Sequence, residues 1–146
     1  MKNLFILLLL LISLQGYSQA KHYICIAPNV AFDSTVQDPN NLLGCTVEVG
    51  RYVGDNAIGI TTGLFSMDIK SLYSELIVTV PVSKELPITI SAGMGWFYFQ
   101  KDITMEYDIN YAFQLKDNLS LIVTYNGQSA FGATTQSFCI GLNKDF

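Results

Sequence analysis

The sequence predicts an all-β protein in which eight antiparallel strands close into an up-and-down transmembrane barrel. Three observations support this fold class. Apolar and polar residues alternate strictly from Thr104 to Leu115, which is the periodicity of a strand and not of a helix. A strand of this length can cross a bilayer at a tilt of about 45°. The same alternation recurs in seven further segments, which turn-forming residues separate at regular intervals.

Residues 1–20 are expected to be a cleavable signal peptide, and residues 21–146 the barrel domain. A lysine precedes the apolar run Leu4–Leu14, and small residues then suit cleavage before Lys21 or, alternatively, after Ser18. The apolar run is shorter than the roughly 20 residues that a membrane-spanning helix needs. This favours an export signal over a membrane anchor.

The first half of the mature chain divides into four strands. A polar loop, Asp33–Asn41, follows the first, and a tight turn beginning at Gly54 follows the second. Pro28 removes a ladder donor from the first strand, where we expect a bulge. In the third strand, Ile58 and Ile60 oppose glycine and threonine. The expected strands are Tyr23–Phe32, Leu43–Val53, Ala57–Phe65 and Leu72–Pro81.

The second half divides in the same way. Tight turns begin at Ser83 and Lys116, whereas the small-residue segment Asn126–Ala133 is expected to be a longer loop. In the fifth strand, Ile88, Ile90 and their successors oppose threonine, serine and glycine. The expected strands are Pro87–Phe99, Thr104–Leu115, Leu119–Tyr125 and Thr134–Phe146. Short turns on the side of both termini and longer loops on the other are typical of membrane barrels. Here the connections after the third and fifth expected strands are short too, so the match is partial.

The apolar face of these strands is expected to point outward, into lipid. Its large side chains are too many for the interior of an eight-stranded barrel, which is just wide enough to be filled by side chains. The opposite face is rich in glycine, serine and threonine, which suit a crowded interior. The competing interpretation is a secreted, soluble, lipocalin-like barrel that turns its apolar face inward around an apolar ligand. The lipid-facing residues expected on the longest strand are Met105, Tyr107, Ile109, Tyr111, Phe113 and Leu115.

Four acids within the strands share the inward face, and we expect them to form a polar cluster in the lumen: Glu48, Glu75, Glu106 and Asp108. Such a cluster can serve acid–base chemistry or hold a cation. It can equally be a polar plug bonded to Thr, Ser, Asn and Tyr, which is the interpretation we favour. Few inward bases are available as partners, so we expect some of these acids to be protonated or hydrated.

The last ten residues, SFCIGLNKDF, place Phe138, Ile140 and Leu142 on alternate positions and finish at Phe146. They resemble the C-terminal strand of Gram-negative outer-membrane proteins, although Lys144 stands where that family usually has an apolar residue. Over its mature length the chain resembles the small OmpA/OmpX-type barrels. The resemblance implies location in the cell outer membrane and insertion by the barrel-assembly machinery, with these four apolar residues as the C-terminal assembly signal.

Catalytic and cofactor chemistry is not expected. His22 is the single histidine and stands outside the expected first strand, and no metal-ligand spacing occurs. Cys25 and Cys139 share the inward face of the first and last strands, so they form either a disulfide or two buried thiols, and Cys45 is left over. The net charge of −4 and the lack of basic clusters argue against nucleic acid as a partner.

The sequence therefore predicts a non-enzymatic, integral outer-membrane barrel without an open pore or a cofactor. It would act structurally or through surface interactions of its short outer loops. The expected partners are outer-membrane lipid, the assembly machinery during insertion and an unidentified surface ligand, and the expected state is a monomer.

Overall fold

The computed structural model describes residues 21–31, 43–64, 69–99, 101–130 and 133–146. Outside the described part lie the expected signal peptide, the expected loop Asp33–Asn41, and the strand-end residues Phe32 and Phe65. Within that part, no helix is long and apolar enough to span a bilayer.

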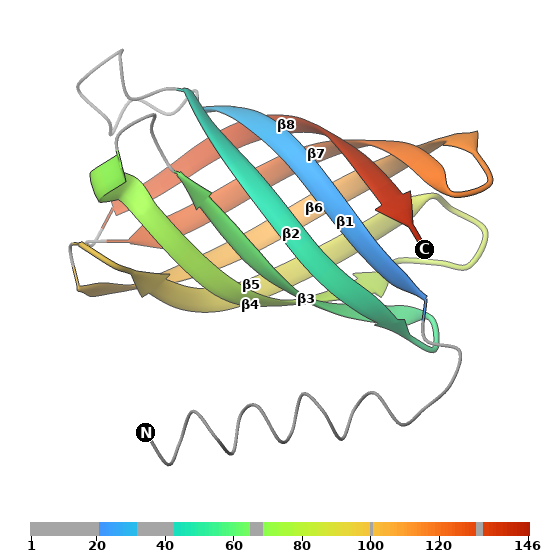
Figure 1. Ribbon diagram of the computed structural model, residues 1–146, viewed down its shortest axis with the longest axis horizontal. Coiled ribbons are helices and arrows are strands. Elements are labelled where there is room, and N and C mark those ends of the chain that lie inside the picture. Colours follow the sequence, from blue (N-terminus) through green and yellow to red (C-terminus); the bar gives the residue numbers. More distant parts are fainter. Residues whose placement is uncertain (1–20, 32–42, 65–68, 100, 131–132) are drawn as a thin grey trace.

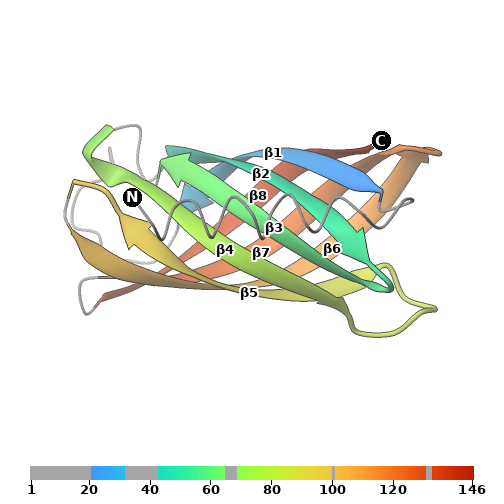
Figure 2. The same cartoon turned by 60° about the horizontal axis from the view of Figure 1, so that its bottom comes forward.

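Eight antiparallel strands form one closed barrel, as expected (Figure 1). Each strand pairs with its neighbours in the chain, and the last strand pairs with the first. A view turned by 60° shows the strands inclined to the barrel axis on both walls (Figure 2). The strands are β1 (His22–Ala31), β2 (Leu43–Val53), β3 (Asn56–Leu64), β4 (Leu72–Pro81), β5 (Ile88–Phe97), β6 (Asp102–Lys116), β7 (Leu119–Ala130) and β8 (Ala133–Asp145), with a short 3-10 helix, η3 (Ile69–Ser71), before β4.

The alternation read in the sequence becomes an alternation of exposure in the barrel wall. In the first half of β6, every second side chain is buried: Thr104 is 0% exposed, Asp108 is 6% exposed, and the intervening Ile109 is 50% exposed. A strand directs successive side chains to opposite faces. Most of the side chains that line the inside of the barrel are therefore small or polar, and most of the large apolar ones cover its outside.

The barrel closes where β1 meets β8. His22 and Phe146 exchange two backbone hydrogen bonds of 2.9 Å at the end of this seam. The bulge expected at Pro28 is absent, because β1 pairs with β2 in one unbroken register through this residue. Pairing with β8 is interrupted between Ile26 and Asn29 and resumes in the same register. Proline thus removes pairing from the ladder here without adding a residue to the strand.

Most strand ends differ from the expected ones by one or two residues, and the end of β7 differs by more. Residues Asn126 to Ala130 continue β7, and β8 begins at Ala133, so most of the segment expected to be a long loop is paired hairpin. Small polar residues resembled a loop in the sequence, but ladder pairing needs only the backbone. His22 was expected outside the first strand and is its first residue.

The two ends of the barrel differ. One end carries Lys21, Phe146 and the connections after β2, β4 and β6; we call it the terminal rim, and the other end the opposite rim (Figure 1). The turn after β2 uses Gly54 at φ +65°, a conformation that favours glycine. Lys84 and Asp55 link two of these connections by an exposed ion pair of 2.6 Å. The hydrogen bond to Asp55 raises the pKa of Lys84.

Candidate functional site

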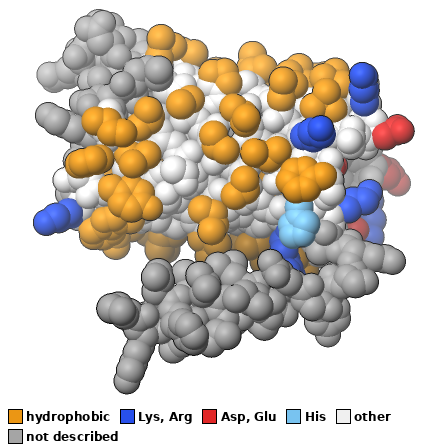
Figure 3. Space-filling view, in the orientation of Figure 1, with side chains coloured by type: hydrophobic (Ala, Val, Ile, Leu, Met, Phe, Trp, Pro, Cys, Tyr) orange, Lys and Arg blue, Asp and Glu red, His pale blue; other side chains and the backbone are white. Residues whose placement is uncertain are grey.

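The outside of the barrel is largely apolar. Hydrophobic side chains are spread over most of the visible face, and most charged side chains there lie at the terminal rim (Figure 3). The six residues expected to face lipid on β6 all point outward and are 40–54% exposed: Met105, Tyr107, Ile109, Tyr111, Phe113 and Leu115. The four residues of the expected assembly signal are 51–70% exposed: Phe138, Ile140, Leu142 and Phe146.

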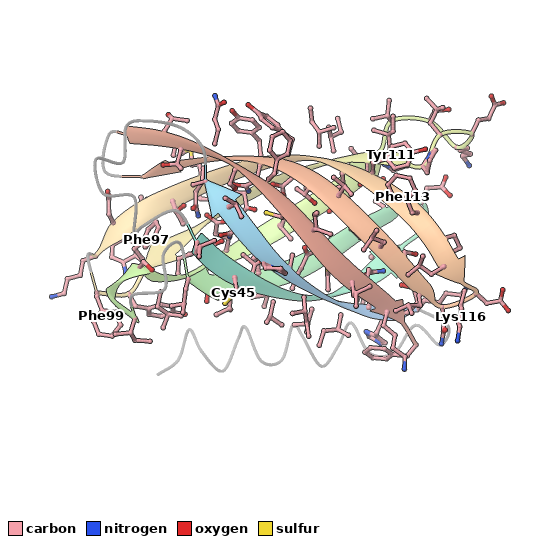
Figure 4. All side chains as sticks on the ribbon, turned by 90° about the horizontal axis from the view of Figure 1, so that it is seen from above. Cys45, Phe97, Phe99, Tyr111, Phe113 and Lys116 are labelled. Atoms are coloured by element: carbon pink, nitrogen blue, oxygen red, sulfur yellow. The ribbon has the colours of Figure 1, made fainter. Side chains whose placement is uncertain are left out.

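Outward aromatic side chains cover the backbone of the wall. The rings of Tyr111 and Phe113 lie 4.6 Å apart at 49°, on the outside of β6 (Figure 4). The ring of Tyr107 lies over Gly127 on β7, where an added Cβ would meet it at 2.0 Å. An aromatic side chain over a glycine protects a ladder that would otherwise be poorly covered.

The four acids of the expected cluster all point into the lumen. Glu75 on β4 is 1% exposed, and Glu106 and Asp108 on β6 are 8% and 6% exposed. Glu48 on β2 is half-buried and lines the same interior. We call these four side chains the lumenal acids.

Neutral side chains donate hydrogen bonds to the lumenal acids. The Asn126 amide donates to Glu106 Oε1 at 2.6 Å and to Asp108 Oδ1 at 2.7 Å. The Gln128 amide donates to Glu75 Oε1 at 3.2 Å. Asparagine and glutamine thus supply donors that lysine or arginine would otherwise supply. Both donors come from the part of β7 that the sequence analysis expected to be loop.

Glu48 is held by Tyr23, a residue that the sequence analysis did not single out. The Tyr23 hydroxyl donates to Glu48 Oε1. An added Cβ at Gly50 would meet the Tyr23 ring at 2.5 Å, and one at Gly59 would meet the hydroxyl at 2.8 Å. The glycines leave the volume that the ring fills. An aromatic residue on the inward face, opposite inward glycines on the next strands, was the signal that could have revealed it.

Removing the Tyr23 hydroxyl should destabilise the barrel. Tyr23→Phe deprives Glu48 of a buried donor, and we expect a loss of about 1–3 kcal/mol in the free energy of unfolding. The measurement is reversible denaturant unfolding of the refolded protein. Tyr98→Phe is the matched control, because the Tyr98 hydroxyl bonds Ser74 at 3.2 Å on the exposed outside. Equal effects of the two substitutions would contradict a structural role for the Tyr23–Glu48 bond.

Large side chains close the lumen toward the opposite rim. The rings of Tyr73 and Phe97 lie 5.4 Å apart, and each residue is 2% exposed. Phe97 and Phe99 lie at this rim, and Lys116 lies at the other (Figure 4). Ile77, 1% exposed, is an apolar residue on the inward face of β4. Small and polar residues were expected inside, and these three large side chains were not predicted there.

Toward the terminal rim, the lumen holds a cavity of 290 Å³. All eight strands contribute to its lining, and inward residues such as Gln114 become exposed where it reaches the rim. The expectation of a filled interior was therefore correct only for the half nearer the opposite rim. The described lining contains Glu48, Glu106, Asp108 and Asp145, and it contains no lysine, arginine or histidine.

The remaining candidate groups are dispersed. His22 is exposed at the terminal rim, where its ring stacks on Phe146 at 6.4 Å. Cys25, Cys45 and Cys139 are free thiols. Cys25 pairs in register with Asn143 and Cys139 with Asn29, so the two inward cysteines are offset along the seam. Among the described residues, no group of three or more His, Cys, Asp or Glu side chains is arranged to hold a metal ion.

Comparison with solved structures places this geometry among membrane barrels. A de novo designed transmembrane β-barrel superposes with a TM-score of 0.62 at 16% identity, covering 86% of this chain and 95% of that one. Neisserial surface protein A gives 0.55 at 11% identity, covering 88% and 98%. The Yersinia pestis outer membrane protein Ail, determined in a phospholipid bilayer nanodisc, gives 0.51 at 9% identity, covering 88% and 100%.

The chain has the fold of a small transmembrane β-barrel. At these identities the similarity concerns the fold alone. No protein-family model matches the sequence, and no curated protein matches it.

Proposed function

We propose that this protein is an integral outer-membrane barrel with a structural or surface-interaction role. One observation carries the proposal: apolar side chains cover the outside, while the buried residues of the lumen include Glu75, Glu106 and Asp108. A soluble barrel that bound an apolar ligand would have the reverse arrangement, with apolar side chains inside. In lipid, this outer surface is buried and the backbone needs no water, because every strand is paired.

Outward side chains of β8 support assembly in that membrane. Phe138, Ile140 and Leu142 form an apolar stripe beside the β1–β8 seam, and Phe146 completes the ladder by bonding the backbone of His22. Barrel-assembly machinery would read this stripe during insertion, and lipid would cover it afterwards. The terminal rim, with its short connections, would then face the periplasm.

The role itself would lie at the opposite rim, on the outer surface of the cell. Connections are the usual carriers of recognition on a rigid scaffold. Two of them would form this surface: the expected loop Asp33–Asn41, which lies outside the described residues, and the tip of the β7–β8 hairpin. The exposed position of His22 at the terminal rim supports a non-catalytic role, since it lies far along the barrel from these connections.

Cell fractionation tests the membrane assignment. We expect the protein in the outer-membrane fraction, resistant to an alkaline carbonate wash and released only by detergent, because about 25 Å of apolar wall would contact lipid. A soluble periplasmic protein treated in parallel is the control, because the carbonate wash should remove it from the membrane fraction. Recovery of the folded protein in the soluble fraction without detergent would overturn the proposal.

The surface role has a separate test. Replacing Asp33–Asn41 by a Gly-Ser linker of equal length should leave the barrel folded and abolish binding in a screen against lipopolysaccharide, host-cell surfaces and phage. Unchanged binding of a partner found with the wild type would assign the recognition surface elsewhere.

A further inference from the structure

We propose that the lumenal cavity is a binding site for a small organic cation, an alkylammonium with several N–H donors, which enters from the terminal rim. Neither the fold nor the proposed membrane role requires such a site. The proposal depends on the geometry of the lumen, and it can fail while the membrane assignment stands.

The charge of the cavity favours a cation. Glu48, Glu106 and Asp108 line its depth, and Asp145 lines it near the terminal rim, whereas the described lining has no basic side chain. Asp145 Oδ1 accepts hydrogen bonds from the Tyr52 hydroxyl at 3.1 Å and the Asn143 amide at 3.0 Å, which hold it in place. A cleft of one sign of charge with low-dielectric walls focuses the field and concentrates the opposite charge.

Two buried oxygens in the lining point to a ligand that donates hydrogen bonds. Glu106 Oε2 and Thr61 Oγ1 have no hydrogen-bond partner, although Glu106 is 8% and Thr61 3% exposed. Both hydrogens of the Asn126 amide are already used by Glu106 Oε1 and Asp108 Oδ1. Buried polar atoms without partners are rare, and each one calls for an explanation.

The neighbours of Glu106 cannot satisfy this oxygen without an extra proton. The carboxyl groups of Glu75 and Asp108 lie within hydrogen-bond reach of it. An ionised carboxylate accepts hydrogen bonds without donating any, so a bond to either neighbour requires a proton, and a bound cation would take the place of that proton. An ammonium group supplies three donors and a compensating positive charge, and it has no acceptor that would need a partner. It therefore suits a carboxylate oxygen such as Glu106 Oε2 and a hydroxyl oxygen such as Thr61 Oγ1.

The size and the walls of the cavity favour an organic cation over a metal ion. A volume of 290 Å³ accommodates a short carbon chain, and it lies at the lower end of the range of about 300–1,000 Å³ that is usual for small-ligand sites. Tyr23, Tyr52 and Tyr73 belong to the lining, and aromatic side chains are common neighbours of bound organic cations. The carboxylates of the described residues are not clustered as metal ligands are.

The ligand would enter and leave by one end. Tyr73 and Phe97 close the lumen toward the opposite rim, with 2% exposure each. At the terminal rim, Gln114 is exposed and Thr79 and Thr89 are partly exposed, and all three line the cavity. Within the described residues, the cavity thus opens toward the terminal rim, and large side chains stand between it and the opposite rim.

Isothermal titration of the full mature chain in nonionic detergent tests the proposal, with 1,4-diaminobutane as the probe and 1,4-butanediol as its neutral match. We expect saturable binding of the diamine and none of the diol. Glu106→Gln should weaken diamine binding by about tenfold or more, because it neutralises a buried charge partner. Glu85→Gln removes one negative charge from an exposed turn outside the cavity and should leave the affinity unchanged.

Thr61→Val is the second variant, because it keeps the shape of the side chain and removes an unpartnered hydroxyl. It should fold like the wild type and weaken the diamine severalfold, which keeps the test decisive if Glu106→Gln does not fold. Equal binding of diamine and diol, or no binding of either, would overturn the proposal and leave a hydrated lumen. Equal losses in Glu85→Gln and in the lumen variants would also overturn it, since they would indicate attraction to overall charge.

Discussion

Ile109→Lys should destabilise the barrel in lipid bilayers by about 2–4 kcal/mol, whereas Leu115→Lys should cost about 0–1 kcal/mol. Both residues point outward from β6, and their exposed fractions, 50% and 54%, are nearly equal. They differ in depth, because Ile109 lies at the middle of the strand and Leu115 near the terminal rim. A lysine near the rim can extend its ammonium group to water.

Denaturant unfolding in liposomes measures both variants. In a water-soluble barrel the two positions would be similar exposed surface sites, and neither substitution would change stability by more than about 0.5 kcal/mol. The difference in unfolding free energy between the two lysine variants therefore shows whether a bilayer surrounds the strands. Equal and small losses of stability in the two variants would contradict the presence of a bilayer around the strands, even if the barrel is folded.

Gly95→Ala should destabilise the barrel by about 3 kcal/mol or more, at the upper end of the usual cost of overpacking. A Cβ at this position would lie 1.8 Å from the Ser74 carbonyl oxygen and 2.6 Å from the Glu75 Cα. These are backbone atoms of the paired strand β4, so they cannot move away without separating the two strands. The unfolding free energy in detergent or liposomes is the measurement.

Gly93→Ala is the matched control, on the same face of the same strand. Its Cβ would meet the Leu76 carbonyl oxygen at 3.3 Å and Ile77 at 3.6 Å. We expect its stability to lie within about 1 kcal/mol of the wild type, since the contact is tight but needs only a small adjustment. Similar losses of stability in both variants would show that alanine is unfavourable anywhere on this face of β5. The close approach of β4 to Gly95 would then not be the cause.

Much of the lumen was predictable because alternate residues of a strand point to the same face. Glu106 and Asp108 stand two residues apart on a strand, so they must share a face, and their opposition to Ile109 assigned that face to the interior. Glu48 and Glu75 followed by the same rule. The partners of these acids were not predictable. Asn126 reaches Asp108 through the register of β7 with β6, and Gln128 reaches Glu75 of β4 only across the closed lumen.

Register also explains the other omissions. Tyr23 lies opposite Gly50 only once β1 and β2 are aligned, and the space for its ring exists only in that alignment. Tyr73, Ile77 and Phe97 share the inward face with small residues and fill the space that those residues leave. A single sequence has no information on that space, because it depends on the tilt and stagger of all eight strands together.

The sequence by itself determined the strands and the apolar face of each, because the alternation of side chains is a property of a single strand. It also determined that this face points outward, because the interior is too small for so many large side chains. Only the tertiary structure decided which side chains meet across the lumen, that one half is plugged and the other hollow, and that Glu106 keeps a buried oxygen without a donor. These features depend on register between strands, which backbone hydrogen bonds set over the whole closed barrel and which no single strand contains.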